Sequence, residues 1–369
     1  MVNKPTTVSN TIFFAVLLGL AAPGLAAPPE GRGGGKDKGG DVVCEEGIFS
    51  PVIFAREYFV PSRPVQMSED GSCFQVIATH GDLTHNGVKG QRYFLTPEPS
   101  QWTLPNGSVG YDLVAYNEDG DPETRRVLTS DQSIARFGQP RWSIDGTQVA
   151  YVGARYDLDF GDVVEQGIFL GEVTHDFAGA PDQIVEERLV IGADPNEYLI
   201  PALSWSGDRI AYGTSRPVYD SNGGVIDFER EIYVADMSLG VSYEIQLADG
   251  GSATYPSFSP ADNRLAFTRT TSTTGCFRTD IYVVVVPEGY NGTHALPATQ
   301  ITNQKNAKRL CQIRRAYWSP MVTYLAFDAW ASIPYSGMQI YKIKSDGSGN
   351  AVQLTNSKTQ GYLVTGWRD

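Results

Sequence analysis

The stretch Gln139–Val152, QPRWSIDGTQVAYV, decides the fold of this chain. It predicts a strand, a tight turn and a second strand, because Asp145-Gly146 is a favoured hairpin turn between two apolar runs. Trp142 and Tyr151 supply apolar positions on the two sides of that turn. The segment therefore predicts a β-hairpin that forms the first half of a larger structural unit.

The same motif occurs three more times, and a truncated copy lies at the C-terminus. The copies are Pro201–Tyr212 (PALSWSGDRIAY), Tyr255–Phe267 (YPSFSPADNRLAF), Arg315–Phe327 (RAYWSPMVTYLAF) and Val364–Asp369 (VTGWRD). Their anchoring aromatic residues lie roughly 50 to 60 positions apart, and self-similarity at such a period is typical of a repeat array.

Two further strands follow each copy. The third strand of the unit is predicted at Gln166–Val173, Arg230–Asp236, Thr279–Val284 and Met338–Ile343. A fourth, shorter strand holds Gln246-Leu247, Gln300–Thr302 or Gln353–Thr355. Each unit thus has four short strands, which is the content of one β-propeller blade.

The motif order W-S-x-D-G, I/V-A-Y/F, I-Y-V and Q-L-T resembles the WD-like blades of TolB-type β-propellers. The resemblance runs from about Gln139 to the C-terminus, and two turns depart from it: Trp205–Asp208 is shortened, and Met321-Val322 replaces Asp-Gly. It implies an all-β propeller of four-stranded antiparallel blades. It also implies the class of periplasmic protein-interaction modules, although the motif residues themselves serve packing and turns.

The N-terminal region has the composition of a targeting segment followed by a linker. Residues 1–27 contain Lys4 and the apolar run Ile12–Ala22, which predicts a secretory signal peptide. That run is shorter than the roughly 18 residues a membrane span needs. The Gly-rich segment 28–41 predicts a disordered linker, and 42–369 predicts a single propeller domain in a periplasmic or secreted protein.

The number of blades depends on the region before Ser130. Strands are predicted there, and Arg126–Thr129 resembles the end of a blade. Trp367 begins a blade that has no second strand, and the turn and strand in Ser68–Ile77 could complete it. We therefore expect N-terminal and C-terminal strands to close the ring in one blade, which would remove an exposed sheet edge. Six blades are favoured, with five as the alternative.

The formal net charge of −13 argues against a nucleic-acid partner. No further stretch is apolar enough to suggest a transmembrane segment. An envelope or extracellular protein or peptide is therefore the expected partner, and the protein is expected to be monomeric.

The predicted blade order places the long connections on one face. If the strands are named a to d from the axis outward, the b–c and d–a connections lie together, opposite the short a–b turns. The long b–c connections are Gly153–Glu165, Gly213–Glu229, Arg269–Arg278 and Asp328–Gly337. Long loops on a rigid scaffold usually carry binding, and neutral insertions are the alternative.

Six residues are candidates for partner binding. The polar neighbours of the anchoring aromatics should line the axial channel, although the strand register is open. Two aromatic residues in a long b–c loop could form a binding platform, with packing as the alternative. The candidates are Arg141, Ser204, Ser257, Tyr317, Trp330 and Tyr335.

The four cysteines suit disulfides in a secreted protein. Cys276 and Cys311 are expected on the loop-rich face of adjacent blades, so a disulfide between them would link those blades covalently. Cys44 would then pair with Cys73. The sequence alone permits three connectivities.

The sequence assigns no catalytic residue and no definite cofactor. Alternating carboxylates at Asp157, Asp159 and Asp162 could bind Ca²⁺, or they could form a solvated acidic turn. His80 and His85 form a weak candidate for metal or acid–base chemistry. Two functions remain open. The first is a non-catalytic scaffold for a protein or peptide, and the second is a propeller lyase or hydrolase with a metal-assisted or His-assisted site in the central channel.

Overall fold

The computed structural model describes residues 52–57, 64–71, 74–76, 84–85, 93–103, 107, 109–117, 122–129, 131–143, 146–193, 198–206, 208–272, 278–303, 305–308, 310–331, 337–357 and 361–368. The chain divides into two compact units, Met1–Gly40 and Asp41–Asp369, and every described residue belongs to the second. The predicted signal peptide (1–27) and linker (28–41) lie outside the described residues and stay predictions. In the part of the chain that the structure describes, no helix has the length and apolar character to cross a bilayer.

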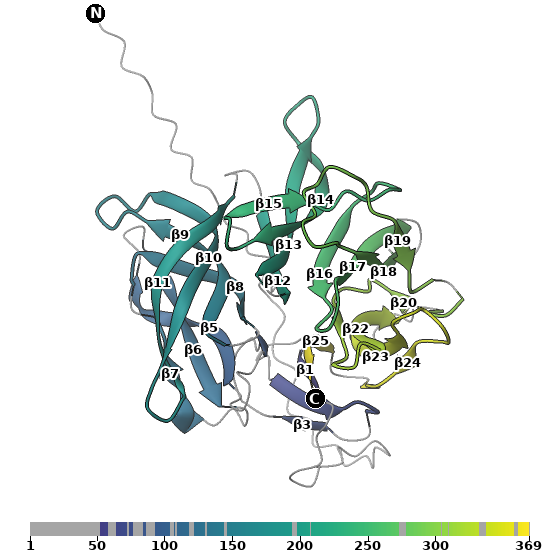
Figure 1. The fold of residues 1–369 in the computed structure, drawn as a ribbon, viewed down its shortest axis with the longest axis horizontal. Coiled ribbons are helices and arrows are strands. Elements are labelled where there is room, and N and C mark those ends of the chain that lie inside the picture. The colour runs from purple at the N-terminus through teal and green to yellow at the C-terminus, as the bar shows by residue number, and fades with distance from the viewer. Residues whose placement is uncertain are drawn as a thin grey trace, which may run out of the picture. The chain divides into compact units, whose positions relative to one another are not determined.

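Within the described residues the strands form six antiparallel sheets, shown in Figure 1. Two of these sheets come largely from the region before Ser130. The first sheet contains β25 (Tyr362–Arg368), β1 (Val52–Glu57), β2 (Pro64–Ser68) and β3 (Phe74–Val76). The second sheet contains β4 (Thr84–His85), β5 (Tyr93–Thr103), β6 (Val109–Asn117) and β7 (Arg126–Val127), with the 3-10 helix η1 (Pro122–Thr124) before β7.

Among the described strands, the last pairs with the first. β25 runs antiparallel to β1, from Val52 opposite Arg368 to Glu57 opposite Tyr362. The turn and strand expected in Ser68–Ile77 belong to the same sheet, where β3 pairs with β2, and the strand next to β25 is β1. Gly71 has a φ of 74° in this turn, so the chain folds back onto β2 at that point.

The stretch that decides the fold is the hairpin of β8 (Ile134–Trp142) and β9 (Gln148–Tyr156). Trp142 lies opposite Val149 across the hairpin. Gly146 has a φ of 72° and donates its N–H to the Ser143 carbonyl at 3.0 Å, as the Asp-Gly turn predicts. The sheet is completed by β10 (Val163–His175) and β11 (Pro181–Gly192).

The remaining three sheets repeat this order. The fourth contains β12 (Tyr198–Ser206), β13 (Arg209–Tyr219), β14 (Val225–Asp236) and β15 (Val241–Glu244). The fifth contains β16 (Ala253–Phe258), β17 (Arg264–Ser272), β18 (Arg278–Val285) and β19 (Ala298–Gln300). The sixth contains β20 (Leu310–Cys311), β21 (Ala316–Trp318), β22 (Tyr324–Ala331), β23 (Gln339–Lys344) and β24 (Val352–Gln353).

The two aromatic motif positions of each repeat meet across the second and third strands. Tyr151 of β9 and Phe169 of β10 lie opposite one another with their ring centroids 5.7 Å apart. Equivalent stacked pairs occur in the next three sheets at 5.3 to 5.9 Å, namely Tyr212–Tyr233, Phe267–Tyr282 and Phe327–Tyr341. Directly opposed aromatic residues stabilise an antiparallel pair, which explains why A-Y/F and I-Y/F recur together.

The anchoring aromatics pack between neighbouring sheets. Trp318 is buried, and its indole Nε1 donates to the backbone carbonyl of Ser257 in the adjacent sheet at 2.8 Å. The Arg264 guanidinium lies over the Trp318 ring, 4.8 Å from its centroid, and Arg209 lies over Phe258 in the same way at 5.3 Å. The predicted packing role of Trp318 and Phe258 is therefore confirmed.

One strand from each sheet contacts its counterpart in the next sheet, and we call β25, β4, β8, β12, β16 and β21 the inner strands. β4 contacts β8, β8 contacts β12, β12 contacts β16 and β16 contacts β21. β25 contacts both β21 and β4. Contacts therefore connect each described sheet with the next, and the sheet of the chain ends touches the sheets on both of its sides.

The predicted long loops at Gly153–Glu165 and Gly213–Glu229 are largely strands instead. The strands β9 and β10 leave only a short turn closed by the Asp157 N–H and the Asp162 carbonyl at 2.8 Å. The turn between β13 and β14 is closed by the Asp220 N–H and the Gly224 carbonyl, also at 2.8 Å. These segments are rich in β-branched and aromatic residues, which favour extended backbone where a paired strand supports them.

Candidate binding site

The inner strands share an irregularity at one place. Pairing with the second strand shifts register between Phe137 and Arg141 in β8, and between Thr254 and Ser257 in β16. β12 shifts at the matching position, between Ile200 and Ser204. Bulges turn side chains to new directions and occur next to functional sites.

Strained backbone occurs in this region. Tyr255 has a φ of 53° and Gln312 a φ of 42°, although neither is a glycine. Tyr255 lies in the β16 irregularity, and Gln312 lies between β20 and β21. Such conformations cluster at binding sites, where the surrounding structure holds them in place.

Two of the predicted binding residues meet in this region. The guanidinium of Arg141, on β8, donates from Nη2 to the hydroxyl oxygen of Tyr317, on β21, at 2.8 Å. The same guanidinium lies 5.6 Å from the Tyr317 ring centroid, and its Nη1 is 3.5 Å from the Thr365 carbonyl oxygen on β25. The Arg141 side chain therefore connects three inner strands while only 5% of it is exposed.

A second arginine, Arg315, immediately precedes β21. The Arg315 guanidinium lies 5.6 Å from the ring centroid of Tyr255. Its Nη1 is buried without a hydrogen-bond partner among the described residues, and so is the Oγ1 of Thr365. Buried donors without partners are rare in folded proteins, so each of these two groups could accept a polar ligand group as its partner.

The other predicted binding residues are not brought into this cluster by any described contact. The Ser257 side chain is buried, and its backbone carbonyl serves the contact with Trp318. Ser204 pairs with Ala211 through the backbone, and its side chain lies outside the described atoms. We expected Trp330 in a loop, but it lies in strand β22, opposite Cys311 of β20. Tyr335 lies outside the described residues.

The acidic turn proposed for Ca²⁺ is organised by its own backbone. A carboxylate oxygen of Asp157 accepts the N–H groups of Asp159 and Phe160 at 2.8 and 3.1 Å. Asp159 and Asp162 are exposed. Among the described residues no group of three or more His, Cys, Asp or Glu side chains is arranged to hold a metal ion. The calcium site stays a prediction.

Sequence reasoning missed a buried ionic cluster in the third sheet. Arg136 is 1% exposed, and its guanidinium donates to both carboxylate oxygens of Glu187, at 2.9 and 2.5 Å. The Tyr151 hydroxyl donates to the same carboxylate. Burial, followed by the charge of Glu187, raises the pKa of Tyr151. No spacing rule reveals this cluster, because Arg136 and Glu187 are 51 positions apart.

A second buried pair lies in the fifth sheet. The guanidinium of Arg278 donates to both oxygens of Asp280, at 3.0 and 2.7 Å, and Thr302 donates to that carboxylate at 3.0 Å. Each of the two carboxylates, Glu187 and Asp280, therefore accepts hydrogen bonds from an arginine guanidinium through both of its oxygens. Ion pairs of this kind also occur as purely structural networks in folded proteins.

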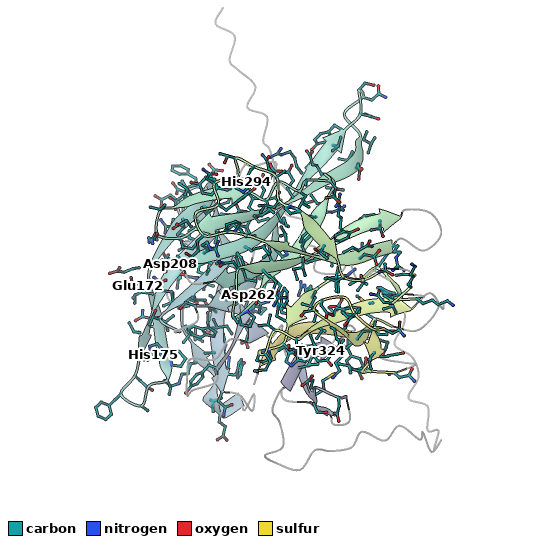
Figure 2. The ribbon with its side chains drawn as sticks, turned by 45° about the vertical axis from the view of Figure 1, so that its right-hand side comes forward. Glu172, His175, Asp208, Asp262, His294 and Tyr324 are labelled. Atoms are coloured by element: carbon teal, nitrogen blue, oxygen red, sulfur yellow. The ribbon has the colours of Figure 1, made fainter. Side chains whose placement is uncertain are left out.

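The remaining titratable side chains of note do not converge. Figure 2 shows the labelled histidines His175 and His294 at separate places, with Glu172, Asp208 and Asp262 spread over different strands and turns. His80 lies outside the described residues, and for His85 only the backbone in β4 is described. Convergent geometry of the kind that acid–base or metal chemistry needs is not seen among the described groups.

Exposed apolar side chains gather instead at two hairpins. At the β9–β10 tip Phe160 is 80% exposed, and at the β13–β14 tip Ile226 is 65% exposed. Other large apolar side chains exposed at these hairpins are Leu158, Val163, Val164, Val218, Tyr219, Val225 and Phe228. Because both turns join the second strand of a sheet to the third, they lie at the same end of two contacting sheets.

Cys311 is buried in β20 and is disulfide-bonded. Cys276, Cys44 and Cys73 lie outside the described residues. The predicted pairs Cys276–Cys311 and Cys44–Cys73 therefore stay predictions.

Comparison with known proteins identifies the fold. No protein-family model matches the chain, and no curated protein matches it. TolB from Acinetobacter baumannii is similar in structure, with a TM-score of 0.55 and 12% identity over 87% of this chain and 67% of that one. A puromycin-hydrolysing peptidase of Mycobacterium tuberculosis is less similar, with a TM-score of 0.46 and 14% identity over 80% of this chain and 42% of that one. An oligogalacturonate lyase in complex with manganese has a TM-score of 0.43 and 13% identity over 83% of this chain and 73% of that one. The strand order and the similarity to TolB show that this chain has a TolB-like β-propeller fold.

Proposed function

We propose that the chain is a non-catalytic β-propeller scaffold that binds a protein or peptide partner outside the cytoplasm. The observation that carries the proposal is the exposed apolar surface at the β9–β10 and β13–β14 hairpins. Contiguous apolar surface on a folded protein marks interaction sites, whereas scattered single residues do not. The predicted signal peptide supports a periplasmic or secreted location.

We further infer that the six described sheets are the six blades of one propeller, closed by β1 and β25. Contacts of the inner strands link each sheet with the next, and β25 contacts both β21 and β4. A closed propeller is a rigid platform without exposed inner edges, and that rigidity suits the display of two hairpins on one face.

The cluster of Arg141 and Tyr317 adds a second element to the proposed scaffold. Arg315 lies two positions before Tyr317 in the sequence and next to Tyr255. A carboxylate of the bound segment could accept a hydrogen bond from the unpartnered Nη1 of Arg315. The cluster contains no described nucleophile, carboxylate pair or metal site, so it favours binding over the lyase or hydrolase alternative.

The test is site-specific photo-cross-linking in the envelope fraction of producing cells. A photoreactive side chain at Phe160 or Tyr219 should give a discrete cross-linked partner. The matched control is Phe177, which is fully exposed at the β10–β11 turn, at the opposite end of its sheet. Equal cross-linking at Phe177 would contradict the proposal, and so would turnover of a polysaccharide or ester by the purified chain.

A further inference from the structure

The Arg141 side chain crosses the centre of the ring of inner strands. In the order of their contacts, β8 and β21 are three steps apart in either direction, through β12 and β16 or through β4 and β25. The Arg141 guanidinium on β8 nevertheless donates to the Tyr317 hydroxyl on β21 at 2.8 Å. Inner strands that are three blades apart face one another across the axis of a six-bladed propeller. The Arg141–Tyr317 contact therefore closes the axis at this level.

Arg315 lies on one side of this closure, towards the hairpin end, by which we mean the end of the sheets where the second strand turns into the third. β21 pairs antiparallel with β22, so the start of β21 lies at the hairpin end of its sheet. Arg315 is two positions before Tyr317, which is about 7 Å along an extended chain. A segment that enters the axis from the hairpin end therefore passes Arg315 before it meets Arg141.

The Arg315 guanidinium has no counter-ion. Within the described part of the chain it forms no ion pair and no hydrogen bond, and its Nη1 is buried. Other partly buried arginines of the chain pair with carboxylates, as Arg136, Arg269 and Arg278 do. The chain carries a net charge of −13, so carboxylates are abundant in it. A partly buried cation that none of them neutralises is positioned for an anion from outside the chain.

Tyr255 holds this guanidinium without neutralising it. The Arg315 guanidinium lies 5.6 Å from the Tyr255 ring centroid. Tyr255 has a φ of 53° and lies where the pairing of β16 with β17 shifts register, so strained backbone presents the ring. A ring attracts a guanidinium stacked on its face, but the N–H groups lie in the plane of the guanidinium and stay available to a planar acceptor.

A carboxylate at the end of a peptide chain fits these conditions. It is planar, carries one negative charge and accepts two parallel N–H bonds from one guanidinium. A phosphate group carries nearly two negative charges, which one unpaired guanidinium does not balance. Because the Arg141–Tyr317 contact closes the axis, a peptide that enters from the hairpin end must present a chain end, and the C-terminal end carries the carboxylate.

We propose that Arg315 binds the C-terminal carboxylate of a peptide segment that enters the axis from the hairpin end. Arg315 is partly exposed, and a small rotation of its guanidinium turns the buried Nη1 towards the carboxylate. Tyr255 fixes the guanidinium, and Arg141 with Tyr317 forms the floor at which the segment ends. The inference rests on the proposed function, because it names the chemical group by which the scaffold holds its partner.

The test compares two pools of short peptides on the immobilised full chain. Both pools have random sequence and a blocked N-terminus, but one ends in a free carboxylate and the other in an amide. The chain should retain the carboxylate pool at least about tenfold better. Arg315→Gln, which keeps a similar shape but removes the charge, should abolish this preference. The matched control Arg188→Gln removes the same charge from an exposed position on the outermost strand β11 and should change the preference by less than about twofold.

Thermal unfolding separates a binding role of Arg315 from a structural one. Arg315→Gln removes an unpaired cation, so its unfolding temperature should stay the same or rise. Arg141→Gln should unfold at a lower temperature, because it loses the contacts with β21 and β25. A fall for Arg315→Gln as large as that for Arg141→Gln would show that Arg315 is a structural residue and would overturn the inference.

Two binding results would also overturn it. One is equal retention of both pools, which side-chain carboxylates or apolar contacts at the hairpins would produce. The other is an equal loss of preference in Arg188→Gln, which would mean that overall charge governs binding. Selective retention of the carboxylate pool, with no partner cross-linked at the hairpins, supports this inference and contradicts the proposed function. A cross-linked partner without any preference between the pools does the reverse.

Discussion

At the scale of single residues, burial and hydrogen bonding change how a side chain ionises, as Tyr116 on β6 shows. Burial, and then the hydrogen bond from its hydroxyl to the Glu98 carboxylate, raises the pKa of Tyr116 to about 12. The folded protein therefore holds this proton more tightly than the unfolded chain does.

The raised pKa predicts a fall in stability at high pH. Because the pKa in the folded state exceeds the unfolded value of about 10, the contribution of the Tyr116 phenol is fully present below pH 10 and is lost as the pH rises towards 12. Tyr116→Phe removes the ionisable group, so its free energy of unfolding should fall less over this window. Urea unfolding of both proteins below and within the window measures the difference. Parallel losses in the two proteins would contradict the assignment.

At the scale of elements, the third sheet is tied together across its strands. The pairing of β10 with β11 is interrupted next to Glu187, and the preceding residue, Glu186, has a φ of 51°. Glu187 reaches Tyr151 on β9 and Arg136 on β8. The strained turn in β11 is thus linked to an ion pair that joins the first strand of this sheet to the last.

This ion pair predicts a large loss of stability from a small change. Glu187→Gln leaves the buried Arg136 guanidinium without a counter-ion, and breaking such a pair costs about 3–5 kcal/mol. Glu165→Gln is the matched control, because Glu165 pairs with Arg155 at 3.0 Å in a partly exposed place. The control should cost less than about 1 kcal/mol. Urea unfolding measures both variants, and similar losses would show that the Arg136–Glu187 pair is not desolvated.

At the scale of the whole molecule, the first and last strands that the structure describes are joined in one sheet. β25 completes the sheet of β1, β2 and β3 and contacts inner strands of the two neighbouring sheets. Without β25, the edge of β1 would be exposed and the contacts with β21 and β4 would be lost.

Deletion of residues 362–369 should therefore destabilise the entire domain and not one sheet alone. We expect a loss of cooperative unfolding and a gain of aggregation, because an unpaired edge strand recruits other chains. Circular dichroism during thermal unfolding, combined with light scattering, measures both effects. Deletion of residues 1–41, the predicted signal and linker, is the control and should leave the transition unchanged. An intact cooperative transition after the C-terminal deletion would contradict closure of the ring by β25.

The sequence by itself determined the strand content, the repeat and the fold. Each Trp142-type anchor, turn and aromatic pair acts through neighbours in the chain or in the adjacent strand, and such short-range patterns are readable as periodicity. The sequence also indicated Arg141 and Tyr317 as inner-strand residues, although it could not show that their side chains meet across the sheets.

Only the tertiary structure decided which distant residues share a site. Arg136 and Glu187 meet at a strained irregularity within β11, and β25 pairs with β1 in the sheet that the strand of Ser68–Ile77 also joins. The hairpins of β9–β10 and β13–β14 were mistaken for loops, because exposed β-branched runs extend strands only when a paired strand supports them. Side-chain contacts between sheets depend on how twisted sheets pack, and no spacing in one chain records that geometry.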